Sequence, residues 1–124
     1  MVIGIGTDIV EVERVRRAVE SERFCERVYT SDEQAYCRGR GMQAAASYAA
    51  RFAGKEAVLK AFGTGLRAGS LLDIEILPDE LGCPRVALYG YFAAMARDMG
   101  AARIHISLSH SRDYATAQCI LEAD

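Results

Sequence analysis

The sequence has little of what a membrane protein or a nucleic-acid-binding protein needs. No apolar run approaches the roughly 18 residues that cross a bilayer. The first residues, Met1 to Gly6, form neither the basic segment nor the long apolar segment of a signal peptide. The net charge of −2 argues against a nucleic-acid-binding surface. We therefore expect no membrane and no nucleic-acid partner.

Cysteine is present without the spacing that metal sites require. The four cysteines show no C-x-x-C pair and no histidine at metal-ligand distance, and they are Cys25, Cys37, Cys83 and Cys119. Free thiols agree with a reducing cytoplasm. With 26% charged and 51% hydrophobic residues, the 124-residue chain has an ordinary globular composition. We expect a single domain over residues 1–124.

Hydrophobic periodicity predicts mixed secondary structure. Strands are expected at residues 2–10, 73–77, 84–88, 103–109 and 114–121. Helices are expected at residues 11–20, at 22–38 with a break near Thr30 and Ser31, at 42–62 and at 89–99. Thr30 or Ser31 would cap the helix that follows, and residues 66–70 would form a loop.

The first strand carries two glycines beside a carboxylate. With a period of two, Gly4, Gly6 and Asp8 share one face. The missing side chains leave room for another group to approach the backbone. An equally simple interpretation is a strand packed on a close neighbour, with Asp8 capping the next helix. A Rossmann phosphate loop does not fit, because the third glycine of its motif is absent.

The helix expected at residues 42–62 carries an ionic pair in an unexpected place. At 100° per residue its apolar stripe contains Ala45, Ala49, Phe52 and Leu59. Glu56 falls within that stripe, which is unfavourable unless a cation or hydrogen-bond donors contact it. Lys60 lies one turn further on and Lys55 lies at the flank, so an ordinary Glu–Lys pair is the alternative interpretation. Gly54 costs about 1 kcal/mol relative to alanine in a helix, so we expect another element to pack closely there.

Two further groups of polar residues attract attention. His105 alternates with Ser107 and Ser109 on one face of its strand, which is also the pattern of a solvated strand face. Arg14, Arg16 and Arg17 cluster on the first helix. Each alone is ordinary for a solvated helix, but together they could bind an acidic partner.

The chemistry of these groups suggests a metal and a phosphate. Two carboxylates, Asp8 and Glu56, without a cysteine–histidine set suit a hard cation such as Mg²⁺. The positive charge for a phosphate would come from Lys55, Lys60, Arg51 and His105. The residues alone thus predict a metal-dependent protein that handles a phosphorylated ligand.

Three segments resemble the signature blocks of a known family. They read GIGTDIVE from Gly4, RFAGKEAVLKA from Arg51 and SLSHS from Ser107. Their order and spacing are similar to those of the 4′-phosphopantetheinyl transferases in the short bacterial form. Gly54, where the family often has alanine, and Ser111, where threonine is frequent, are small departures.

The resemblance implies a fold and an activity. The fold is α+β, with an antiparallel-rich sheet packed against the long helix. The activity is transfer of the phosphopantetheine arm of coenzyme A to a serine of apo acyl carrier protein, in fatty acid biosynthesis. The other product is adenosine 3′,5′-bisphosphate.

The resemblance also implies roles for individual residues. Asp8 and Glu56 would bind Mg²⁺. Lys60 would stabilise charge on the phosphate or deprotonate the serine, and Glu56 or a water on the metal is the other candidate base, a choice that stays open. Gly63 and Gly65 would let the backbone approach the nucleotide, and its phosphates would contact Arg51, Lys55 and His105. The arginines of the first helix would contact the acidic carrier protein.

By the same resemblance, the chain would form a homotrimer with sites at the subunit interfaces. Asp8 and Glu56 would then meet His105 or Arg51 of a neighbouring subunit. Two rival functions use the same residues. One is a metal-dependent phosphohydrolase of a nucleotide or coenzyme A, and the other is a non-catalytic nucleotide sensor.

Overall fold

The computed structural model describes residues 1–65 and 68–124, and it has the predicted α+β architecture. Its elements are β1 (Val2–Glu11), α1 (Val12–Ala18), α2 (Glu22–Val28), α3 (Ser31–Arg38), the 3₁₀ turn η1 (Gly41–Gln43), α4 (Ala44–Phe62), the 3₁₀ turn η2 (Leu71–Asp73), β2 (Ile74–Pro78), β3 (Pro84–Leu88), α5 (Gly90–Met99), β4 (Arg103–His110) and β5 (Tyr114–Glu122). Most predicted boundaries agree within two residues. Of the loop expected at 66–70, residues 66 and 67 lie outside the described residues.

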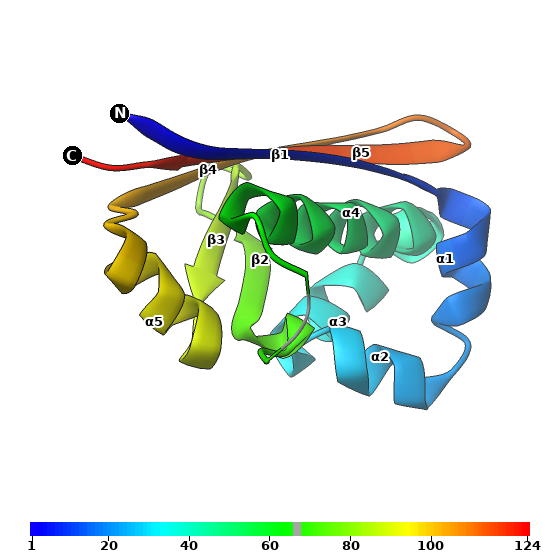
Figure 1. Ribbon diagram of the computed structural model, residues 1–124. Helices are drawn as coiled ribbons and strands as arrows, with labels where there is room; N and C mark the ends of the chain where they lie inside the picture. Colours follow the sequence, from blue (N-terminus) through cyan, green and yellow to red (C-terminus); the bar gives the residue numbers. More distant parts are fainter. Residues whose placement is uncertain (66–67) are drawn as a thin grey trace.

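The strands form one three-stranded and one two-stranded antiparallel sheet. The first has the order β1-β5-β4, and the second is the β2–β3 hairpin. The long helix α4 runs between the three-stranded sheet and helices α2 and α3 (Figure 1). Both chain ends lie at the same end of this sheet (Figure 1), where the Met1 amino group donates to the Ala123 carbonyl oxygen at 2.8 Å. The antiparallel-rich sheet on a long helix is therefore confirmed.

The glycines of β1 allow this strand to lie directly on α4. A Cβ atom on Gly4 would overlap the carbonyl oxygen of Ala61, and one on Gly6 would overlap that of Ala57. The group that approaches the strand backbone is therefore the helix. Asp8 continues the same strand face and also meets α4, where Lys60 contacts it. The expectation that Asp8 caps the next helix was wrong, because the N-cap of α1 is Glu11 and no side chain caps that helix.

Helix α4 is buried on nearly all sides. Of its 19 residues, all but Ala44, Phe52, Glu56 and Lys60 are buried. The predicted single inward stripe was therefore wrong. A helix enclosed by other elements has no polar side to define a stripe, and its least buried line is the one that carries Phe52, Glu56 and Lys60. The close packing expected at Gly54 is confirmed, since a Cβ atom there would lie 2.6 Å from Cδ1 of Ile76.

Short helices close the structure around α4. Val12 and Val15 of α1 are buried against the core, as their spacing predicted. Thr30 caps α3 in a capping box with Glu33. Among the described residues, no helix is long and apolar enough to cross a membrane.

Candidate active site

Strand β1 and helix α4 bring Asp8, Glu56 and Lys60 together. The Lys60 Nζ atom lies 3.1 Å from Oδ1 of Asp8 and donates to the Thr7 carbonyl oxygen at 3.0 Å. The Asp8 side chain is 16% exposed and that of Lys60 is 55% exposed. The packing of Gly4 and Gly6 on α4 creates this contact, because it places the next side chain of the same strand face against the helix. Sequence positions more than 50 apart thus form one polar group at the surface.

The ionised carboxylate of Glu56 is in an unfavourable environment at this position. It is half-buried, and burial is the main cause that raises its pKa above the ordinary value of 4.5. The carboxylate of Asp8 raises this pKa further, whereas Lys60 lowers it. The carboxylates of Asp8 and Glu56 therefore share the ammonium group of Lys60. When both carboxylates are ionised, this one positive charge balances only part of their negative charge.

This donor set fits a divalent cation with a preference for oxygen. In residues 1–65 and 68–124 no group of three histidine, cysteine or acidic side chains could enclose a metal ion. Mg²⁺ needs no such enclosure, because it is commonly held by one or two carboxylates together with waters and substrate phosphates. Asp8 and Glu56 could supply those carboxylates, and the added charge would offset the repulsion that raises the Glu56 pKa.

An apolar pocket lies next to these residues. It has a volume of about 420 Å³, and its lining includes Ile9 of β1, Arg14 of α1, Phe24 of α2, Phe52 of α4 and Tyr114 of β5. Ile9 follows Asp8 in the chain, and Phe52 lies one helical turn before Glu56. The sequence reasoning missed Phe24 and Phe52 as site residues. The only available signal was an aromatic residue one turn before the Glu56–Lys60 pair, which equally suits a core position.

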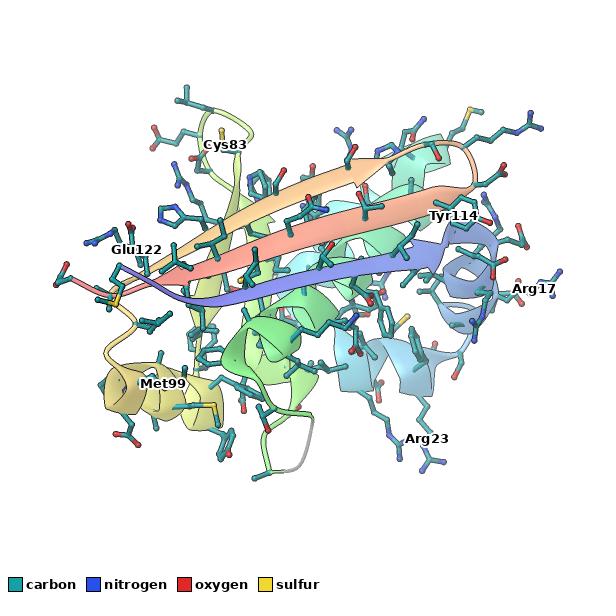
Figure 2. The ribbon with its side chains drawn as sticks, turned by 45° about the horizontal axis from the view of Figure 1, so that its top comes forward. Arg17, Arg23, Cys83, Met99, Tyr114 and Glu122 are labelled. Carbon is teal, nitrogen blue, oxygen red and sulfur yellow. The ribbon has the colours of Figure 1, made fainter. Side chains whose placement is uncertain are left out.

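The three arginines lie on α1, the helix that supplies Arg14 to this pocket. All three are exposed, but Arg16 and Arg17 both pair with Glu13, at 3.1 Å and 3.4 Å. Arg14 lines the pocket itself. Figure 2 shows Arg17 extending into solvent at the α1 end of the molecule, near Tyr114. Exposed ion pairs of this kind are weak, so the arginines remain available to an acidic partner.

Lys55 does not belong to this site, contrary to its prediction as a phosphate ligand. Its side chain is fully buried, and its Nζ atom lies 2.7 Å from Oε1 of Glu33, which is also fully buried. Because protein oxygens surround its ammonium group, Lys55 has no N–H donor left to bind a phosphate of coenzyme A.

Arg51 and His105 also lie away from Asp8 within one chain. Arg51 is buried on another flank of α4, where its Nε atom donates to the Ile76 carbonyl oxygen at 3.1 Å and its guanidinium stacks on Tyr36. His105 lies on the exposed outer face of the sheet, with Nε2 3.0 Å from Oε1 of Glu122. Figure 2 places Glu122 at the end of the sheet opposite Tyr114. Hydrogen bonds from Arg103 and His105 lower the Glu122 pKa to about 2.

The predicted glycines end α4 close to Lys60. Gly63 adopts a left-handed conformation with φ of 77° and closes the helix through its N–H, which donates to the Lys60 carbonyl oxygen at 3.0 Å. Gly65 is exposed, and a Cβ atom there would meet no atom of residues 1–65 and 68–124 within 4 Å. The backbone at both positions is open to an approaching ligand.

Comparison with known proteins places this arrangement in a family. The family model described as the 4′-phosphopantetheinyl transferase superfamily matches residues 4–119. The chain belongs to this superfamily. A holo-[acyl-carrier-protein] synthase of Ruminiclostridium cellulolyticum is 48% identical to this transferase over 94% of the chain and 90% of that protein.

Solved structures agree with the sequence relatives of this transferase. The holo-[acyl-carrier-protein] synthase of Neisseria meningitidis superposes with a TM-score of 0.89 and 34% identity, over 98% of this chain and 99% of the other. That of Bacillus anthracis, solved in complex with CoA (3′,5′-ADP), gives a TM-score of 0.83 and 36% identity over 100% and 99%. These relatives give no support to the phosphohydrolase alternative.

Proposed function

We infer that the chain transfers the 4′-phosphopantetheine group of coenzyme A to a serine of apo acyl carrier protein, releasing adenosine 3′,5′-bisphosphate. The observation that carries this function is the meeting of Asp8, Glu56 and Lys60, which come from two signature blocks of this transferase family. Relatives named as holo-[acyl-carrier-protein] synthases, including one with coenzyme A bound, support the same reaction.

We propose that Asp8 and Glu56 bind Mg²⁺ together with the pyrophosphate of coenzyme A. The raised pKa of Glu56 supports this role, because a carboxylate pair short of positive charge favours a bound cation. A cation held there would neutralise part of the negative charge that develops on the pyrophosphate oxygens.

Lys60 is suited to hold the reacting phosphate. The serine oxygen attacks the β-phosphorus, the bond from that phosphorus to the bridging oxygen breaks, and the serine proton passes to a base. The Lys60 ammonium already donates to oxygen atoms of Thr7 and Asp8 and is half exposed, so it can reach an incoming phosphate oxygen. Glu56 and a water on the metal are both candidate bases, because Glu56 lies beside Asp8 and Lys60 where the serine would attack.

The pocket and the arginine helix together suggest how the protein substrate docks. We propose that acidic groups of the carrier contact Arg14, Arg16 and Arg17, while an apolar side chain enters the pocket lined by Phe24 and Phe52. This arrangement would present the carrier serine beside Asp8. Electrostatic contacts of this kind mainly set the association rate and its salt dependence.

A complete site needs residues that one chain keeps apart. Within one chain the buried Arg51 and the exposed His105 both lie away from Asp8, and the outer face of the sheet exposes Ile5 at 71% and Ile9 at 61%. We therefore propose a homotrimer in which these residues approach the Asp8–Glu56 pair of a neighbouring subunit. Exposed apolar side chains on one sheet face are typical of a surface that another subunit covers.

Other properties follow from the reaction and remain proposals. Residues 1–124 would form one transferase domain. A core cluster that joins side chains of β1, α4 and β5 supports this proposal. The product is holo-carrier protein, so we propose a role in fatty acid biosynthesis, in the cytoplasm.

One assay tests the proposed function directly. Apo carrier protein, coenzyme A and Mg²⁺ are incubated with the enzyme, and mass spectrometry follows the carrier. We expect a phosphopantetheine adduct on the carrier, none on a carrier whose acceptor serine is alanine, and none when a chelator replaces Mg²⁺. No adduct on any carrier of the same organism would contradict the transferase function. Transfer that persists undiminished with chelator present would contradict the metal site alone.

A further inference from the structure

Lys55 and Glu33 form a fully buried ion pair that the transfer chemistry does not use. Their Nζ–Oε1 distance is 2.7 Å, and neither side chain is exposed. Lys55 Nζ also donates to the carbonyl oxygens of Val28 at 2.6 Å and Leu71 at 2.9 Å. An ammonium group has three donors, and these three oxygens use all of them.

Glu33 extends the network on its other side. Its Oε1 atom accepts from the backbone N–H of Thr30 at 2.9 Å, and its Oε2 atom accepts from that of Ile76 at 2.7 Å. The pair thus connects α4 to the end of α2, the start of α3, η2 and β2. They come from two parts of the chain, near residues 28–33 and 71–76, and the pair ties both parts to α4.

Arg51, one helical turn before Lys55, completes the attachment of β2. Its Nε atom donates to the carbonyl oxygen of Ile76, whose N–H is bound by Glu33. In the described part of the chain β2 pairs with β3 alone. Side chains therefore take the place of a further strand along the inner edge of β2.

We propose that Lys55 and Glu33 are a positioning pair for the transfer site, an inference that rests on the proposed function. Glu56 follows Lys55 in the chain, so the bonds that fix Lys55 also fix the rotation of the α4 turn that carries Glu56. The same bonds hold the end of α2, the helix that supplies Phe24 to the apolar pocket described above. The pair therefore sets where the metal-binding carboxylate lies relative to Asp8 and to the docking surface.

A contribution to stability alone is a weaker explanation of this pair. Removing two charges from water costs about as much as their attraction returns, and apolar residues of similar volume often replace buried ion pairs without loss of stability. What apolar residues cannot supply is the set of directed bonds to Val28, Leu71, Thr30 and Ile76. Fixing one arrangement of several backbone segments is the property that needs an ion pair here.

The test compares a variant of the pair with a control of similar thermal stability. Lys55→Met keeps the aliphatic stem and removes the ammonium. Leu121→Ala removes fully buried volume in β5, where Leu121 is paired with Gly4 and Ile104, whereas Asp8 is paired with Ala117. Each protein is measured at the same interval below its own Tm. The readouts are kcat, KM for coenzyme A, KM for the carrier, and the dissociation constant of Mn²⁺ alone, by electron paramagnetic resonance.

We expect Lys55→Met to bind Mn²⁺ more weakly than the wild type and to lose between about ten- and a hundredfold in kcat, because a shift of about 1 Å in a catalytic group costs up to that factor. KM for coenzyme A should change less than kcat. Leu121→Ala should keep the wild-type Mn²⁺ affinity and kcat. A folded Lys55→Met variant with the kcat and Mn²⁺ affinity of the wild type would overturn the inference. So would an equal loss of kcat and Mn²⁺ affinity in Lys55→Met and Leu121→Ala.

A second variant covers the case in which Lys55→Met does not fold. Lys55→Met combined with Glu33→Gln leaves no unpaired buried charge, and the amide oxygen still accepts one backbone N–H. The same losses in kcat and Mn²⁺ affinity are expected, and wild-type values would overturn the inference. Failure of the proposed function is distinguishable, because then the wild-type protein itself would show no transfer to the carrier.

Discussion

Replacing Gly6 by alanine tests whether the seating of β1 on α4 places Asp8. The φ angle of Gly6 is not positive, so its backbone accommodates alanine without strain. The obstacle is the helix. The added Cβ atom would overlap the Ala57 carbonyl oxygen and lie 2.7 Å from the Ala61 nitrogen. Both are backbone atoms of α4, so they cannot rotate away as a side chain can. Strand and helix must separate by roughly 1.5 Å to restore ordinary contact distances near 3.5–4 Å.

The structure allows the size of two effects to be estimated. Overpacking of this kind costs about 1–3 kcal/mol, which corresponds to a fall in Tm of about 4–12 °C for a chain of this length. Asp8 lies two residues further along the same strand face, so it moves with the strand. A displacement of about 1 Å at a catalytic group lowers the rate by up to about a hundredfold. The assay measures Tm by calorimetry and kcat for carrier modification at equal intervals below each Tm.

Gly39→Ala provides the matched control. A Cβ atom at Gly39 would lie 3.4 Å from its nearest neighbours, and its φ is −68°. We expect an unchanged or slightly raised Tm and unchanged kcat, because alanine restricts the unfolded chain more than glycine does. A Gly6→Ala protein with wild-type Tm would refute the packing argument. One with lowered Tm but wild-type kcat would refute the link between this packing and the position of Asp8.

Three further predictions concern charge. Glu56→Gln should abolish transfer and, without divalent metal, raise Tm at pH 7. Because the folded-state pKa of Glu56 lies above 4.5, ionising Glu56 in the folded protein costs stability as pH rises from 4.5. The gain in Tm should therefore vanish toward pH 4.5, which calorimetry across pH checks. Arg14→Glu with Arg17→Glu should raise KM for the carrier far more than it lowers kcat, and should weaken the salt dependence; an unchanged KM would remove α1 from the docking surface. For Glu122, a folded-state pKa of about 2 means a stabilising contribution present above pH 4.5 and lost as pH falls from 4.5 to about 2, so Glu122→Gln and wild-type stabilities, measured by urea unfolding, should differ at pH 7 and converge near pH 2.

The sequence predicted most of the secondary structure because each signal was local. Alternation over residues 103–109 indicated a strand, and β4 spans Arg103–His110. Thr30 or Ser31 was expected to cap a helix, and α3 begins at Ser31 with Thr30 as its N-cap. Such patterns depend on residues close in sequence, and here they agree with the fold that the whole chain adopts.

The burial of α4 could not be predicted in the same way. A stripe of apolar residues identifies an inward face only when the opposite face meets water. Here alanines and Gly54 let a sheet, a hairpin and three helices approach one helix, so almost every residue is inside. Under those conditions the informative residues are the few that are not buried. Phe52, Glu56 and Lys60 form that line, and it coincides with the proposed site.

Lys55 and Glu56 show why a motif cannot assign roles by itself. They are adjacent in one signature block, and both are charged, yet a rotation of 100° about the helix axis separates the environments of their side chains. Lys55 enters the core and binds Glu33, whereas Glu56 lies beside Asp8 at the surface opening. A partner 22 positions before Lys55 decides this difference, and no spacing rule connects the two. We therefore propose two roles within one block, Lys55 to build the site and Glu56 to act in it, and only the fold separates them.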